Sequence, residues 1–230
     1  MLSKLKNVWV HSPVYKFYER HFNNQLRKKL TNENFTILCT NCIGGTICHR
    51  LGQRFNSPTV NLSIDDTHQF CCFLANLDFY LNSEFEEAGF NQNGQPCGIL
   101  KGDRLATASE NLPDIFVEFV HYKTFEEGVQ KWNERKERIN KDNIYVIMYD
   151  CENGYNVDGY AKEEDLKLLE AFPCNNKVLL TRNPDCKKPY AHYIEPNGNS
   201  RFQRKYFDFD IFGIRAYEKK FDYVAFLNKK

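Results

Sequence analysis

Short apolar runs alternate with longer amphipathic stretches along most of this chain. Apolar runs rich in β-branched and aromatic residues predict strands, and apolar positions three and four residues apart predict helices. The predicted strands are residues 35–39, 59–64, 115–122, 144–149 and 177–181. The predicted helices are residues 13–30, 46–55, 67–81, 124–139, 162–171 and 217–227. This order contains two successive β-α-β runs.

Several helix starts carry capping signals. Ser12 comes directly before Pro13, and Asp65 or Asp66 precedes the helix expected at residue 67. Thr124 and Glu127 have the spacing of a capping box. These signals place the first turns of three helices.

The β-α-β order favours parallel pairing with right-handed crossovers. We therefore predict two Rossmann-like, three-layer α/β subdomains with mainly parallel sheets and a cleft between them. Repeated glycine and proline in residues 89–114 indicate a connecting loop, with a hairpin near residues 97–101. The predicted units are a basic N-terminal helix (1–33), a first α/β unit (34–88), this connection (89–114) and a second α/β unit (115–230).

The cysteine content, the lengths of the apolar runs and the net charge limit the classes of protein to which this chain can belong. The 230 residues include nine cysteines, an odd number scattered along the chain, which is not typical of a secreted disulfide framework. No secretory signal or membrane-spanning run is predicted, so we expect a cytoplasmic location with free thiols. The net charge of +1 argues against a nucleic-acid partner.

The charge is uneven at the N-terminus. Residues 1–30 carry seven Lys or Arg, and aromatic residues are interleaved with them. Such a helix suits peripheral contact with an anionic membrane, here the inner face of the cytoplasmic membrane. The alternative is an ordinary amphipathic helix packed on the domain.

The junction between the first strand and its helix is the most informative segment. Cys42 falls at this turn, where a helix N-terminus favours the thiolate. Asn41, Gly44 and Gly45 surround it, and the glycines would let a ligand approach the backbone closely. Cys42 is therefore a candidate nucleophile, although free cysteines are also commonly buried core residues.

Other chemical groups follow the remaining strands. Parallel topology would bring the carboxyl ends of the strands to one edge, together with His121, Asp150, Thr181 and Arg182. Cys42 would then attack an acyl group, His121 would accept its proton and Asp150 would orient the imidazole. A structural role for His121 is the alternative.

Two further readings of the cysteines stay open. Cys39 and Cys42 form a CxxC pair, which suits redox chemistry in some proteins. Cys39, Cys42, Cys48 and His49 could also be metal ligands, but a second CxxC is lacking and they span a strand, a turn and a helix. We expect no metal site.

The helix over residues 124–139 carries Trp132, Arg135 and Arg138 at three-residue spacing. On a shared face they would form a strip suited to a sugar or base ring and to phosphate or carboxylate groups. The alternatives are a charged solvent face, or a Trp132 that anchors the helix to the sheet.

Six segments resemble a bacterial domain family of unknown function found in exopolysaccharide and capsule biosynthesis loci. They are residues 41–45, 57–61, 119–123, 132–140, 145–148 and 221–228. The resemblance spans residues 34–228 and implies two α/β subdomains and a cytoplasmic role in making surface polysaccharide. Its motifs add Asn61 and Lys123 as ligand-binding candidates.

Two functions follow as hypotheses. One is a sugar acyltransferase, or a related transferase, that uses Cys42 on a polysaccharide precursor with an acyl or nucleotide-linked donor. The other is a non-catalytic module that binds a nucleotide-sugar or glycan precursor. The sequence assigns no cofactor.

Overall fold

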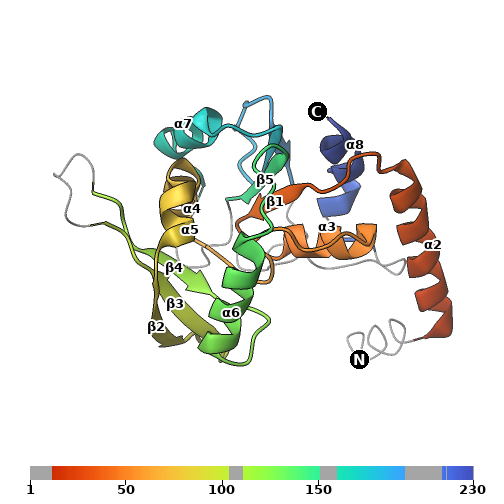
Figure 1. Ribbon diagram of the computed structural model, residues 1–230. Coiled ribbons are helices and arrows are strands. Elements are labelled where there is room, and N and C mark those ends of the chain that lie inside the picture. Colours follow the sequence, from red (N-terminus) through yellow and green to blue (C-terminus); the bar gives the residue numbers. More distant parts are fainter. Residues whose placement is uncertain (1–11, 104–110, 151–159, 195–213, 216, 230) are drawn as a thin grey trace.

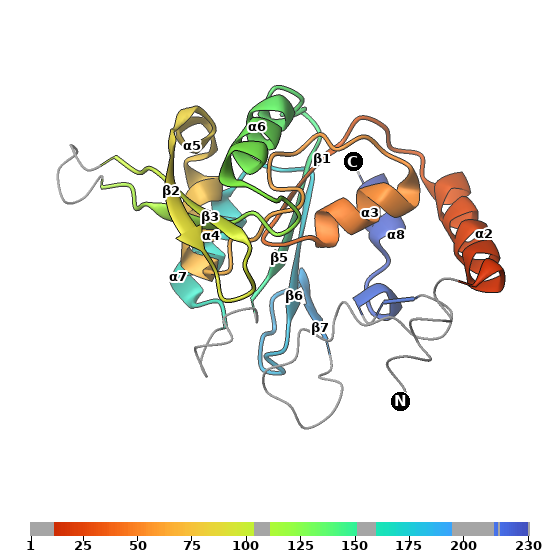
Figure 2. The same cartoon turned by 90° about the horizontal axis from the view of Figure 1, so that it is seen from below.

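The structure is a computed structural model that describes residues 12–103, 111–150, 160–194, 214–215 and 217–229. Four strands form a parallel sheet in the order β1-β5-β6-β7. Their bounds are β1 (Thr36–Cys39), β5 (Ile144–Tyr149), β6 (Asn176–Thr181) and β7 (Ala191–Tyr193). A second, antiparallel sheet holds β2 (Phe85–Phe90), β3 (Pro96–Leu100) and β4 (Ile115–Glu118) (Figures 1 and 2). The predicted mixed α/β class with a parallel sheet is confirmed.

The helices begin close to the predicted capping residues. Side-chain oxygens of Ser12, Asp66 and Thr124 accept hydrogen bonds from backbone N–H groups in the first turns that follow them. The helices are α2 (Pro13–Lys29), α3 (Ile43–Leu51), α4 (Thr67–Ala75), α5 (Leu77–Asn82), α6 (Phe125–Lys136), α7 (Glu163–Ala171) and α8 (Tyr223–Asn228), with a 3₁₀ turn η2 (Tyr217–Lys219). Among the described residues, no helix has the length and apolar character needed to span a bilayer.

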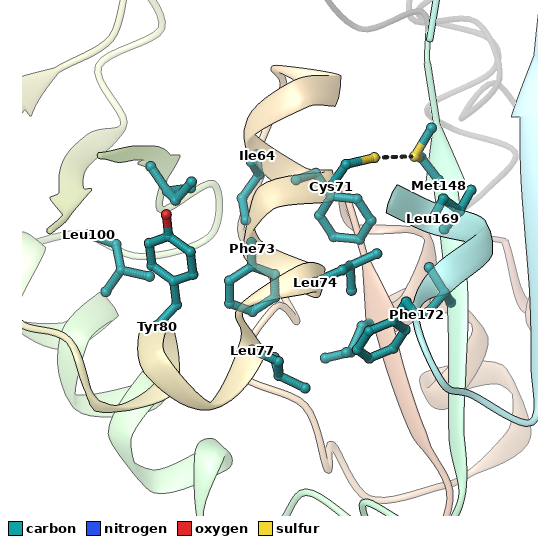
Figure 3. Packing of buried hydrophobic residues seen from close by; sticks show 14 of the residues in the cluster. Ile64, Cys71, Phe73, Leu74, Leu77, Tyr80, Leu100, Met148, Leu169 and Phe172 are labelled. Carbon is teal, nitrogen blue, oxygen red and sulfur yellow. Dashed lines mark hydrogen bonds between the residues drawn. The ribbon is translucent and has the colours of Figure 1, made fainter. Parts of the chain in front are cut away.

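Strand β5 is buried on both faces because its alternate side chains enter two different cores. Ile144, Val146 and Met148 join side chains from α4, α5, α7 and the antiparallel sheet. The three residues that alternate with them are Tyr145, Ile147 and Tyr149, and these join side chains from α3 and α8. Figure 3 shows the first core, where the Cys71 thiol points at Met148. The parallel sheet is therefore the central layer, as its continuous apolar strands require.

The arrangement of the sheets differs from the prediction. β1 pairs with β5, from Thr36 opposite Ile144 to Cys39 opposite Ile147. The first strand of one predicted run therefore lies in the same parallel sheet as the last two strands of the other. The expectation of two mainly parallel sheets is wrong because the second sheet is antiparallel and β4 pairs with β3. The cleft between the two subdomains stays a prediction. Residues 89–114, expected to be a connecting loop, contribute β3 and the end of β2. The boundaries of the four predicted units stay predictions.

Residues 59–64 are a turn rather than the predicted strand. Ser57 Oγ accepts a hydrogen bond from the Thr59 N–H at 3.2 Å, and Thr59 Oγ1 accepts one from the Cys39 N–H at 3.0 Å. Asn61 has a left-handed backbone with φ of 66°. Such local side-chain bonds compete with a sheet ladder, and only Ser63 forms a bridge, to Glu118.

Candidate functional site

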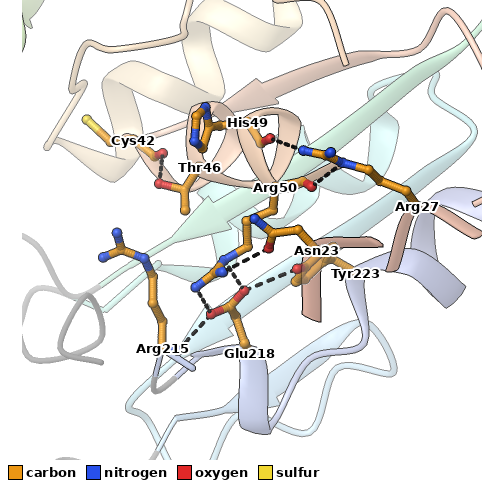
Figure 4. A network of polar contacts seen from close by, with 9 residues as sticks. All are labelled: Asn23, Arg27, Cys42, Thr46, His49, Arg50, Arg215, Glu218 and Tyr223. Atoms are coloured by element: carbon orange, nitrogen blue, oxygen red, sulfur yellow. Dashed lines mark hydrogen bonds and ion pairs between the residues drawn. The ribbon is translucent and has the colours of Figure 1, made fainter. Parts of the chain in front are cut away.

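Cys42 lies at the junction between β1 and α3, as predicted, and is partly exposed. The buried Asn41 accepts the Ile43 N–H on its Oδ1 at 2.9 Å, which caps the first turn of α3. Thr46 Oγ1 donates to the Cys42 carbonyl at 3.1 Å (Figure 4). The helix therefore begins at Ile43, earlier than the predicted residue 46.

The two glycines lie inside α3, and their role is packing. A Cβ on Gly44 would lie 3.2 Å from Cys39 Cβ, and one on Gly45 would lie 3.1 Å from Asn61 Oδ1. The space beside Gly44 and Gly45, where the sequence predicts a bound ligand, is therefore occupied by β1 and by the turn at residues 57–61. Asn61 makes this contact with its side-chain oxygen.

Asp150 and Thr181 meet at the carboxyl edge of the parallel sheet. Both are buried, and Thr181 Oγ1 donates to Asp150 Oδ2 at 2.9 Å. The Ala161 N–H donates to the same carboxylate oxygen at 3.3 Å. The pairing of β1 with β5 places Cys42 at this edge as well. Arg182 follows Thr181 and is half-buried.

His121 comes from the other sheet. It is exposed in the turn after β4, and β4 is antiparallel. Within the described chain, no hydrogen bond or ion pair joins His121 to Cys42 or Asp150. The argument that placed His121 at a shared parallel edge is therefore wrong, and the predicted Cys42–His121–Asp150 triad is not assembled.

Arg135 on α6 is a buried cation. The residue is 8% exposed, and its Nη1 donates to the Val60 carbonyl at 2.7 Å and to the Tyr122 hydroxyl at 2.6 Å. Its guanidinium lies over the rings of Phe55 and Tyr122, at 5.4 and 5.9 Å from their centroids. No carboxylate in the described ranges forms an ion pair with Arg135. A cation is thus buried against neutral groups.

Arg135 and Tyr122 both contact the turn that packs against α3. Burial raises the pKa of Tyr122, and the nearby Arg135 cation opposes this rise. The Val60 carbonyl accepts hydrogen bonds from both Arg135 Nη1 and the Tyr122 hydroxyl, and a Cβ on Gly45 of α3 would lie 3.1 Å from Val60 Cγ1. The turn at residues 57–61 therefore joins Arg135 to the helix that begins after Cys42. Cys42, Tyr122 and Arg135 are hereafter called the Cys42 region.

The other candidates in and next to α6 have different surroundings. Trp132 is 1% exposed and packs against Phe85 and Phe73, with ring centroids 5.2 and 5.9 Å away. Arg138 Nη1 donates to the Phe55 carbonyl at 3.2 Å, and its Nη2 lies 3.8 Å from Glu134. The predicted strip is therefore divided between the core and the surface. Lys123 is exposed where α6 begins, and its backbone N–H donates to Glu127.

Comparison with known proteins identifies the family. The model of a domain of unknown function, DUF1919, matches residues 14–228. The chain belongs to the DUF1919 family. It is also similar to an uncharacterized protein of Haemophilus influenzae, with 32% identity over 219 residues that cover 95% of this chain and 96% of the relative. The resemblance to a bacterial domain of unknown function is confirmed.

Sequence reasoning missed two members of the arginine's surroundings in this DUF1919 chain. Tyr122 was expected at a strand tip without a role of its own, and Phe55 was expected only as the end of a helix. Tyr122 ends a predicted strand and Phe55 ends a predicted helix. Aromatic residues are common at the ends of such elements, so this position does not mark them as functional. Their contact with Arg135 depends on tertiary packing.

Thiol reactivity gives a direct test of the site. Burial raises the pKa of Cys48 to about 12, and burial together with the Asp165 carboxylate raises the pKa of Cys71 strongly. A raised pKa keeps a thiol protonated at neutral pH, and only the thiolate reacts. We expect iodoacetamide at pH 8 to modify Cys42 and to spare Cys48 and Cys71, as measured by peptide mass spectrometry. Faster labelling of Cys48 than of Cys42 would contradict the placement of Cys42 at an accessible helix start.

Proposed function

We propose that this DUF1919 chain binds an anionic sugar precursor, phosphate-bearing or nucleotide-linked, in the Cys42 region. The observation that carries the proposal is the charge of Arg135, which is buried without a carboxylate partner in the described structure. An unpaired buried ion costs free energy, and a bound anion would offset that cost. The planar guanidinium also matches the geometry of a phosphate.

The polysaccharide part of the proposal rests on the sequence motifs. Residues 41–45 and 57–61 belong to the segments that resemble the family of exopolysaccharide and capsule loci. These same segments pack together through Gly45 and Asn61 at the start of α3. We therefore propose a precursor of bacterial surface polysaccharide as the ligand.

Cys42 supports a second, catalytic form of this function. Its thiol is partly exposed at the N-terminus of α3, where the helix dipole favours a thiolate. The Cys42 thiol would lose its proton, and the thiolate would attack the carbonyl carbon of an acyl thioester. The carbon–sulfur bond to the donor would break, and the departing thiolate would take up that proton. A sugar hydroxyl would then displace Cys42 to form the ester, and its proton would return to the Cys42 sulfur.

Binding is tested by calorimetric titration with UDP, a UDP-sugar, a sugar phosphate and the matching neutral sugar. We expect the phosphate-bearing compounds to bind and Arg135→Gln to weaken them about 10- to 100-fold, since a hydrogen bond to a charged group is worth about 1.5–3 kcal/mol. Arg138→Gln is the matched control, in the turn that directly follows α6. It should change affinity by less than about threefold, because Arg138 already has Glu134 beside it.

Melting curves of both variants verify folding. Equal affinity of wild type and Arg135→Gln for every phosphate-bearing compound would refute the binding proposal. The catalytic form is tested separately with Cys42→Ser and an acyl thioester. Loss of an acyl adduct at residue 42 with unchanged sugar binding supports transfer, whereas no adduct on the wild type leaves binding alone.

The exposed side of α2 supports peripheral membrane contact, which we also propose. Val14, Phe17 and Tyr18 are each at least half exposed, and the exposed Lys16 and Arg20 lie among them. Figure 1 shows α2 at the outer edge of the molecule. A basic apolar surface of this kind suits the inner face of the cytoplasmic membrane. Residues 1–11 of the predicted basic segment lie outside the described residues.

A further inference from the structure

A second cluster of chemical groups lies where α4 packs against α7 (Figure 1). His68 and Cys72 are four residues apart on α4 and therefore share a face. His68 Nε2 lies 3.5 Å from Cys72 Sγ, and His68 Nδ1 lies 2.7 Å from Asp165 Oδ1 on α7. A thiol, an imidazole and a carboxylate thus form one chain of hydrogen bonds, in the order that nucleophilic catalysis requires.

From this geometry we propose that Cys72 is a nucleophile that takes an acyl group from an uncharged ester, with His68 as its general base and Asp165 as the residue that positions the imidazole. The site is independent of the Cys42 region and of the function proposed there. Sequence spacing does not show it, because Asp165 is 97 positions from His68 and only the packing of α7 on α4 brings them together.

The hydrogen bonds of His68 determine which ring nitrogen can act as a base. A carboxylate only accepts hydrogen bonds, so Nδ1 donates to Asp165, and Nε2 of the neutral ring keeps a lone pair for the Cys72 thiol. Asp165 is 2% exposed, and its second oxygen accepts the Lys162 N–H at 3.1 Å, so its position is fixed. Of the two neutral tautomers, the one that can accept the thiol proton is therefore favoured.

Cys72 differs from its neighbour Cys71 in accessibility. Cys72 is partly exposed, and the His68 side chain beside it is 55% exposed. Cys71 is fully buried, and its thiol points at Met148 in the core (Figure 3). Successive residues of a helix point about 100° apart, so the two cysteines have different surroundings. Of these two thiols, only that of Cys72 can meet a substrate at the surface.

The thiol of Cys72 depends on its base. Burial, followed by the Asp165 and Asp66 carboxylates, raises the pKa of Cys72. The thiol is therefore protonated at neutral pH, and attack requires the transfer of its proton to His68. The Asp165 carboxylate stabilises the imidazolium that this transfer creates.

The charges around the cluster select the class of substrate. Glu164 adds a carboxylate, and one polar atom each of His68, Glu164 and Asp165 lie within 4.8 Å of one another. Lys162 Nζ is 4.0 Å from Glu164 Oε1, and both side chains are largely exposed. Carboxylates outnumber cations among these described residues, so an anionic acyl donor would be repelled and an uncharged ester would not.

The acylation step needs only the thiol, its base and the ester. The Cys72 thiol gives its proton to His68 Nε2, and Sγ attacks the carbonyl carbon of the ester. The carbon–oxygen bond to the alcohol breaks, and the departing alkoxide takes the proton from His68. The products are a thioester on Cys72 and a free alcohol.

The test treats the full reduced chain with p-nitrophenyl acetate, an uncharged ester that releases a coloured alcohol. We expect an acetyl group on Cys72, located by peptide mass spectrometry and absent in Cys72→Ala. His68→Ala should slow this acylation about 100-fold or more, the usual contribution of a general base. Imidazole added to the buffer should restore part of the rate in His68→Ala, which a merely structural role of His68 would not allow.

Asp165 and the choice of ester have separate readouts. Asp165→Asn should lower the maximum rate of acylation at least about tenfold and leave the half-saturating ester concentration unchanged, because Asp165 acts through the imidazole. A sulfonated analogue of the ester carries a negative charge. Relative to its rate with mercaptoethanol, this analogue should acylate Cys72 more slowly than p-nitrophenyl acetate does.

Three variants control for other thiols and imidazoles. Cys186→Ala changes another partly exposed cysteine, and His49→Ala changes another exposed histidine. Cys42→Ser removes the thiol of the Cys42 region. All three should acylate Cys72 at the wild-type rate, and melting curves verify that every variant folds.

Two results would overturn the proposal. One is a folded wild type that stays unacylated at Cys72, or that is acylated no faster there than folded His68→Ala. The other is acylation that stops in a chelator and requires an added divalent cation, which would assign His68, Glu164 and Asp165 to a metal. The sugar titrations are unaffected by either result, so this proposal and the function of the Cys42 region fail separately.

Discussion

Replacing Glu218 by alanine should lower the free energy of unfolding by about 3–5 kcal/mol, the usual cost of leaving one member of a buried ion pair without its partner. Arg50 on α3 and Glu218 in η2 form this pair, with Nε to Oε1 at 2.7 Å and Nη2 to Oε2 at 3.0 Å. Their side chains are only 6% and 2% exposed. Because a small protein is stable by about 5–15 kcal/mol, the loss would be large.

The surroundings of this pair make the cost of breaking it high. Tyr223 Oη and the Arg215 N–H both donate to the Glu218 carboxylate, at 3.1 and 2.7 Å. Arg50 Nη1 donates to Asn23 Oδ1 on α2 at 3.2 Å (Figure 4). The network therefore connects α2, α3 and the C-terminal segment, and losing Glu218 would leave the Arg50 charge buried.

Urea unfolding followed by circular dichroism would measure this effect. A double-mutant cycle with Arg50→Met and Glu218→Leu separates the interaction from the cost of each truncation. We expect the double variant to be more stable than Glu218→Ala, because it leaves no buried charge. A change below about 1 kcal/mol in Glu218→Ala, the range of an exposed pair, would contradict the burial of this network.

The sequence predicts best those parts of the fold whose signal is local. β1, β5 and β6 are continuous apolar runs, and β5 is predicted with its observed bounds. Parallel pairing of these strands then brings Cys42, Asp150 and Thr181 to one edge, as predicted. The capped helices follow from side-chain oxygens that act within one turn of the chain.

Local sequence patterns do not show which strands pair or which distant side chains form ion pairs. β4 has the composition of a strand, but its partner is the nearby β3 and not the parallel sheet, so His121 leaves the predicted edge. The ion pair between Arg50 and Glu218 joins residues 168 positions apart. Neither residue type signals burial, since arginine and glutamate are usually exposed.

Residues three positions apart in a helix do not point in the same direction, and this offset decides which of them face the core. Three residues of α-helix turn the chain by about 300°, so Arg135 lies about 60° around the axis from Trp132. Arg138 lies beyond α6, which ends at Lys136. This rotation places Trp132 in the core and Arg135 at its margin, whereas Arg138 is partly exposed in the turn after the helix. The predicted strip included a residue that belongs to the core.

Replacing Trp132 by alanine should therefore destabilise the protein by about 3–5 kcal/mol, the range for a buried Trp or Phe. The indole is 1% exposed and makes edge contacts with Phe85 and Phe73 across α6, β2 and α4. Within the described residues its Nε1 has no hydrogen-bond partner. Trp132→Phe consequently removes ring area without removing a hydrogen bond, and it should cost much less than Trp132→Ala.

Chemical unfolding of both variants, beside the ligand titrations, separates the two roles considered for Trp132. A core role predicts a large loss of stability in Trp132→Ala, a small loss in Trp132→Phe and unchanged sugar binding in the phenylalanine variant. Arg138→Gln, with its partly exposed side chain, should stay within about 0.5 kcal/mol of wild type, as surface substitutions usually do. If Trp132→Ala kept wild-type stability and lost sugar binding, Trp132 would be a ligand-binding residue, and its assignment to the core would be contradicted.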